Sequence, residues 1–168
     1  MELVTAAGVI FLGAMLYSTA KKLGQEIALT AFGLYVLEGA LIVVKMLALY
    51  ALLAFSRRFV AAGSPVSMEP TAAMLHELMS YSSRMANFFF CLGGTIFYAI
   101  LLKARTVAWP LSLWGLIGTQ GVFAGVLLGL FGAKAPIFLF VPYIPFELVI
   151  AVWILVKGVE KEEMEWKR

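Results

Sequence analysis

The stretch "GLYVLEGALIVVKML", Gly33 to Leu47, decides the fold class of this 168-residue chain. It is apolar almost throughout, yet it carries Glu38 and Lys45 seven residues apart. Residues at this spacing in an α-helix are two turns apart, about 10.5 Å, on nearly the same face. One stripe of the predicted helix therefore contains Tyr35, Glu38, Ile42 and Lys45. Because a charge at the centre of a bilayer costs roughly 2.5–3.5 kcal/mol or more, we expect this stripe to face other helices.

The composition predicts that the solvent around this chain is lipid. Hydrophobic residues make up 62% of the sequence and charged residues 14%, and the mean hydropathy is +0.95. A soluble domain has about half apolar and about a quarter charged residues, so this chain lacks the polar side chains to cover its surface. Backbone exposed to lipid must satisfy its own hydrogen bonds, which favours helices. We therefore expect an all-α integral-membrane bundle that forms a single domain over residues 1–168.

Five segments are apolar enough to approach the length of about 20 residues that crosses a bilayer. They cover roughly residues 3–20, 27–55, 86–102, 111–132 and 136–157. The start, with Glu2 and no early basic residue, reads as a retained first span rather than a signal peptide. Between the second and third spans, 56–85 is expected to form an amphipathic outer segment whose helix starts at Glu69-Pro70. Residues 158–168 form a charged tail.

The basic residues predict how the chain lies in the plasma membrane. With the N-terminus outside, eight Lys and Arg residues fall on the inner side and four on the outer side. The outer four are Arg57, Arg58, Arg84 and Lys134. The excess of positive charge on the inner side favours an N-out, C-in orientation.

A third charge near the end of the sequence suggests a polar site inside the bundle. Glu147 lies near the centre of the span 136–157, just after Pro142 and Pro145, which interrupt helical hydrogen bonding. A proline-broken span beside a buried carboxylate is one pointer to a binding site in membrane proteins. The hypothesis is that Glu38, Lys45 and Glu147 converge, with Tyr35 and Gln120 as uncharged partners. Such a site would bind a proton, a cation or a small amphiphile such as a lipid. In the alternative reading, the three charges form a structural polar contact that holds the helices together.

Three glycines on the fourth span suggest close helix packing. Gly121, Gly125 and Gly129 recur every four residues, which places them on one helix face. We expect this face to pack within the monomer, while a homodimer seam stays open as an alternative. In the second reading of function, the protein is an accessory or regulatory subunit whose glycine face docks another membrane helix.

The residue inventory argues against several chemistries. The chain has one His, one Cys and no Asp, so no zinc or iron–sulfur ligand set and no nucleophile–base pair is present. We therefore expect no cofactor, no nucleic-acid partner and, on balance, no enzymatic activity. His76 and Met79, one helical turn apart in a Met-rich segment, were weighed as Cu(I) ligands. Met is also an ordinary filler of apolar faces, and Cys91 is expected to pack as a small apolar residue.

The chain resembles a family of small bacterial and archaeal membrane proteins known as domain of unknown function 4386. The resemblance rests on "FFFCLGGTIFYAILLKARTVAWPLSLWGLIG", on "PFELVIAVWILVKG", and on "AMLYSTAKKLGQEIALTAFGLYVLEGALIV" in the first half. The family usually carries an Arg-x-x-Glu pair in the last of these stretches. Here Tyr35 stands at the arginine position, and Lys45 offers a cation further along. The resemblance implies a membrane fold and supports Glu38 and Glu147, but it implies no substrate.

Overall fold

A computed structural model describes residues 2–21, 24–63, 68–104 and 108–157, and over these residues the chain is helical without strands. Two helices are very long: α2 covers Gln25–Ala61 and α3 covers Glu69–Ala104. The shorter helices are α1 (Glu2–Ala20), α4 (Trp109–Leu130) and α5 (Tyr143–Lys157), with a 3-10 turn, η2, at Ile137–Leu139. The expected all-α bundle is therefore confirmed.

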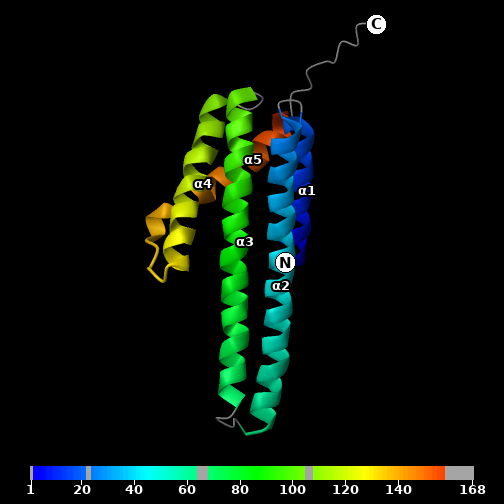
Figure 1. Cartoon of the computed structure of the whole chain (residues 1–168), viewed down its shortest axis with the longest axis vertical. Helices are drawn as coiled ribbons and strands as arrows, with labels where there is room; N and C mark the ends of the chain where they lie inside the picture. Colours follow the sequence, from blue (N-terminus) through cyan, green and yellow to red (C-terminus); the bar gives the residue numbers. More distant parts are fainter. Residues whose placement is uncertain (1, 22–23, 64–67, 105–107, 158–168) are drawn as a thin grey trace, which may run out of the picture.

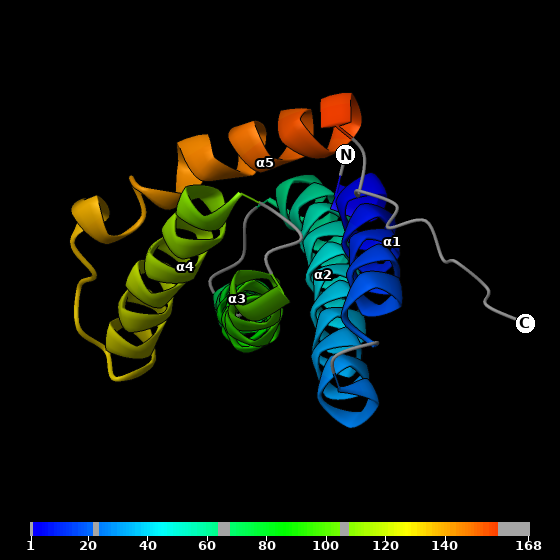
Figure 2. The ribbon, with the colours of Figure 1, turned by 90° about the horizontal axis from the view of Figure 1, so that it is seen from above.

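The two long helices form an antiparallel hairpin that runs the length of the molecule (Figure 1). Helix α1 packs on α2 and helix α4 packs on α3, so both short helices flank the same end of the hairpin. Helix α5 packs mainly on α4 and crosses this end obliquely, as the view from above in Figure 2 shows. The other end of the α2–α3 hairpin extends beyond α1 and α4.

Local sequence explains where these helices begin and end. Pro110 occupies the first turn of α4, where a missing amide proton has no helical partner to lose. Gly63 follows α2 and Gly132 follows α4, each with φ of 77°, the left-handed conformation that commonly ends a helix. The amide of Gly63 donates to the carbonyl of Val60 at 3.1 Å, which completes this cap.

The first and fourth predicted spans match α1 and α4 within two residues at each end. Helix α2 continues six residues beyond the second predicted span, to Ala61. The helix of the amphipathic segment starts at Glu69, as predicted, and continues without a break into the third span, so that both lie in α3. At 36 residues, α3 is about 54 Å long, well beyond the roughly 30 Å of a bilayer core.

The fifth predicted span, 136–157, is not one continuous helix. The turn η2 ends at Leu139, and α5 begins only at Tyr143. Pro142 and Pro145 cannot donate to the carbonyls four residues earlier, which is the interruption that the sequence predicts. Helix α5, with 15 residues, is about 22 Å long.

The surface is that of a protein in an apolar solvent. Three helices, α2, α3 and α4, are long and apolar enough to cross a membrane, and α1 is apolar but shorter. Large apolar side chains are widely exposed; Val4, for example, is 77% exposed and Phe131 86%. Soluble monomers rarely expose so many large apolar side chains, and this surface is compatible with a membrane protein.

Candidate functional site

The stripe on α2 that carries the charges lies on its inner face. Tyr35 is 1% exposed, Glu38 is 7% exposed and Ile42 is 8% exposed. Ala28 and Ala31 continue the same buried face towards the start of the helix. The expectation that this stripe packs against other helices is confirmed for these positions.

Tyr35 is the central contact among the first three helices. A Cβ atom on Gly13 of α1 would lie 2.9 Å from Cβ of Tyr35, and one on Gly93 of α3 would lie 2.7 Å from its ring. Only glycine fits at either position without displacing the ring. The ring also meets Phe90 and Phe97 of α3 edge-on, with centroids 6.2 Å and 5.3 Å away. Tyr35 thus fills the interior between α1, α2 and α3.

Glu38 lies one turn further along the same face. Its neighbour Gly39 lets α1 approach closely, because a Cβ there would lie 2.9 Å from the side chain of Ile10. Glu38 is therefore a carboxyl group enclosed between packed helices.

Lys45 has a partner that the sequence reading missed. Its ammonium donates a hydrogen bond of 2.9 Å to the carboxylate of Glu2, in the first turn of α1. The register of the α1–α2 hairpin explains this pair, since Gly13 lies beside Tyr35 and Ile10 beside Gly39. Extending that antiparallel register by two turns brings Glu2 level with Lys45. The sequence signal for this pair is that Lys45 lies about as far after the loop between α1 and α2 as Glu2 lies before it.

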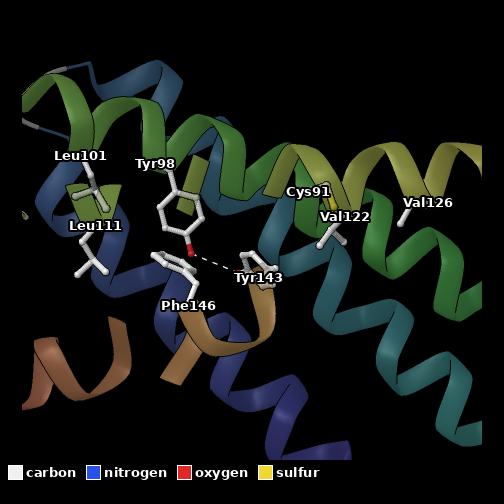
Figure 3. Close-up of a cluster of buried hydrophobic side chains, with 8 residues drawn as sticks. All are labelled: Cys91, Tyr98, Leu101, Leu111, Val122, Val126, Tyr143 and Phe146. Atoms are coloured by element: carbon white, nitrogen blue, oxygen red, sulfur yellow. Dashed lines mark hydrogen bonds between the residues drawn. The ribbon is translucent and has the colours of Figure 1, made fainter. Parts of the chain in front are cut away.

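Aromatic side chains connect this interior to α5. Phe90, which meets Tyr35 on one side, also meets the ring of Tyr143 edge-on at 5.4 Å between centroids. In Figure 3, Tyr143 and Phe146 point from α5 towards Tyr98 of α3, and the Tyr98 and Tyr143 hydroxyls are 3.4 Å apart. We call the contact of Tyr35, Phe90 and Tyr143 the aromatic bridge.

Glu147 follows Tyr143 by one helical turn in α5. The Glu147 side chain lies outside the described residues, so its convergence with Glu38 stays a prediction. By backbone position, Glu147 is one helical turn beyond Tyr143, which is one end of the aromatic bridge. Glu38 is one turn beyond Tyr35, which is the other end.

Gln120 lies at a different interface. Its side-chain amide donates to the hydroxyl of Thr95 at 2.6 Å, and that hydroxyl donates to the carbonyl of Cys91 at 2.7 Å. These bonds connect α4 to α3, and the Gln120 residue is exposed. The described contacts of Gln120 therefore do not bring it to Glu38.

The proline break of the last segment packs on the glycine face of α4. A Cβ on Gly121 would lie 2.7 Å from the carbonyl oxygen of Leu139, and one on Gly125 would lie 2.6 Å from the ring of Phe140. Gly129 has nothing within 4 Å of its Cβ position. The carbonyl of Pro142 accepts a hydrogen bond of 2.9 Å from the indole of Trp114. Side chain and backbone of α4 thus hold the irregular segment between η2 and α5.

The candidate copper ligands lie on one helix, and their role stays a prediction. His76 and Met79 both lie on α3, where His76 is exposed and Met79 half-buried. No group of three or more His, Cys, Asp or Glu side chains within the described ranges has the spacing of a metal site. Cys91 is fully buried in the core cluster of α3, α4 and α5, as expected for a small packing residue.

Comparison with known proteins identifies the family of this chain. No curated protein and no solved structure matches the chain. Residues 1–158 match the sequence pattern of a family described as domain of unknown function, DUF4386. The match extends from the start of α1 to the end of α5 and so includes all five helices. The chain therefore belongs to the DUF4386 family.

Proposed function

We propose that this protein crosses the plasma membrane several times and binds a proton or a small cation at Glu38. The lengths of the short helices support the membrane placement. Helix α1, with 19 residues, is about 28 Å long, and α4, with 22, is about 33 Å long. Both lengths match a hydrocarbon core of roughly 30 Å.

Two bonds define one boundary of this core. Lys45 is bonded to Glu2 at the start of α1, and Arg84 donates to the carbonyl of Gly129 in the last turn of α4, at 3.1 Å. A charged side chain from each long helix thus lies level with the end of a short one. Beyond this level the α2–α3 hairpin extends outside the core. The excess of basic residues at the opposite ends of the helices favours the outer side of the membrane for this extension.

Glu38 then lies about 10.5 Å inside this boundary, two turns from Lys45. The observation that carries the proposal is its 7% exposure within the helix bundle. An ionised carboxylate in such a place is costly, and a bound proton or cation removes most of that cost. Because Glu38 is almost fully enclosed, we propose a proton or small cation here rather than an amphiphile.

The alternative of an accessory subunit that docks through its glycine face has weaker support. Two of the three glycines, Gly121 and Gly125, lie against Leu139 and Phe140 of the same chain. A partner helix would have to displace that segment. Only the Gly129 end of the face is open.

Thermal unfolding of the full chain in detergent tests the proposal, with Glu38→Gln compared to wild type over a pH series and over Na⁺ and K⁺ concentrations. Gln resembles a protonated carboxyl group, so the two proteins should converge at low pH and differ increasingly as the pH rises. If a cation binds instead, it should raise the melting temperature of wild type alone. Glu77→Gln, at an exposed position of α3, is the matched control. Parallel pH and salt dependences for wild type and Glu38→Gln would reject the proposal.

A further inference from the structure

A cavity between α2 and α3 lies at the boundary described above, outside the surroundings of Glu38. Its volume is about 340 Å³, within the range of pockets that hold small molecules. It is lined by Lys45 of α2 and by Met79, Ser80, Ser83, Arg84 and Asn87 of α3. The five α3 residues share one face, because Met79, Ser83 and Asn87 follow one another at intervals of four residues, as do Ser80 and Arg84.

The chemistry of this lining is that of an anion site. Two cations and three neutral hydrogen-bonding side chains face the cavity. No acidic side chain of the described residues lines it, but the Glu2 carboxylate, 2.9 Å from Nζ of Lys45, offsets part of the lysine charge, so Arg84 supplies most of the positive charge. Arginine binds phosphate oxygens with paired N–H donors, and lysine adds a compact positive charge. We infer that this cavity binds a phosphate group, carried either by an anionic lipid or by free phosphate.

Both cations are positioned by bonds that leave donors for a ligand. The Lys45 ammonium has three N–H groups, of which one donates to Glu2. The Arg84 guanidinium has five, of which one Nη1 group donates to the carbonyl of Gly129. Arg84 is further placed over the ring of Tyr81, with its central carbon 5.6 Å from the ring centroid. The side chains are thus held in place before an anion arrives, which lowers the entropic cost of binding.

The depth of the cavity favours the lipid source. Lys45 and Arg84 lie level with the ends of α1 and α4, where lipid headgroups meet the hydrocarbon core in the membrane placement proposed above. Arg84 and Asn87 are exposed, so a headgroup in the surrounding bilayer can reach them. The assignment of the phosphate to a lipid rests on the proposed membrane placement. The phosphate site itself, and its test, do not depend on the proposal for Glu38.

The test titrates the detergent-solubilised full chain with dihexanoyl phosphatidylglycerol, and separately with inorganic phosphate, by isothermal calorimetry. Saturable binding of either probe should weaken about tenfold or more in Arg84→Gln, since a charge-assisted hydrogen bond is lost. Arg57→Gln, at an exposed position near the hairpin tip, should bind as wild type does. Binding of the lipid without binding of phosphate assigns the site to a headgroup, and binding of both at similar affinity assigns it to the phosphate alone.

Ser83→Ala is the second variant, because Arg84→Gln also loses the bond to Gly129, and a loss of stability would then accompany the loss of binding. It should weaken binding while leaving the melting temperature within the error of wild type. The inference is overturned if wild type binds neither probe, or if Arg84→Gln and Ser83→Ala bind as tightly as Arg57→Gln.

Discussion

Lys45 of α2 and Glu2 of α1, 43 positions apart in the sequence, are joined by a hydrogen bond of 2.9 Å. Their side chains are 25% and 42% exposed, so the pair is partly solvated rather than enclosed. Lys45 is therefore paired with Glu2 at the start of α1, while Glu38, on the same face of α2, lies within the bundle. Glu38 and Lys45 thus have different surroundings and different roles.

The exposure of this ion pair predicts a small contribution to stability. A double-mutant cycle with Lys45→Met and Glu2→Gln should give a coupling free energy of about 1 kcal/mol or less, as for other solvated pairs. The measurement is chemical or thermal unfolding in detergent at low and high salt. A coupling of several kcal/mol that does not respond to salt would mean that the pair is buried in the membrane core.

The contacts of α4 predict unequal effects of adding a methyl group to its glycines. Gly121→Ala places a Cβ against the backbone carbonyl of Leu139 and should lower the free energy of unfolding by about 1–3 kcal/mol. Gly129→Ala meets open space and should be neutral or stabilising by up to about 1 kcal/mol. Equal destabilisation by both variants would place a second helix, from another chain, on the Gly129 end of the face.

The bond from Trp114 to the carbonyl of Pro142 predicts a specific role for the indole nitrogen. Trp114→Phe keeps an aromatic ring beside Phe146 but removes this donor, so it should cost about 0.5–1.5 kcal/mol. Trp109→Phe, at a position 58% exposed, is the control and should change stability by less than about 0.5 kcal/mol. If both tryptophans can be replaced at no cost, the break before α5 is held by other contacts.

The helix hairpin predicts which positions are accessible to water from outside the cell. Cys91 is fully buried, so a new cysteine reports on its own site. Ser56→Cys, in the extension of α2, should react in intact cells with a maleimide that cannot cross membranes. Phe11→Cys, 68% exposed in the middle of α1, should not react, because lipid surrounds it. Reaction of Ser56→Cys only after cell lysis would reverse the proposed orientation.

Helix positions could be predicted from the sequence wherever hydropathy alone determines them. The spans at 3–20 and 111–132 match α1 and α4 closely. The start of α3 at Glu69 was predictable from Glu69-Pro70, whereas the C-terminal end of α2 lies six residues beyond the predicted span, where apolar composition no longer determines the helix. The break before α5 was predictable, since Pro142 and Pro145 remove backbone donors whatever the tertiary packing.

The candidate site was predictable only where one helix determines it. The inner face of α2 follows from helical periodicity, and Tyr35 and Glu38 are both buried on it. The partner of Lys45 depends on the register of two helices, and the partner of Gln120 on the packing of α4 against α3. The register of α1 on α2 depends on glycines that allow close approach, such as Gly13, whose partner cannot be assigned from spacing within a single helix.

The central claim is that the Glu38 carboxyl group takes up a proton or cation inside the bundle. Infrared difference spectroscopy of the membrane-reconstituted protein, recorded as pH or cation concentration is changed, observes this group directly. We predict a carbonyl or carboxylate band that responds to the change in wild type and in Glu77→Gln and is missing in Glu38→Gln. Difference spectra that are the same with and without the Glu38 carboxyl group would contradict the account.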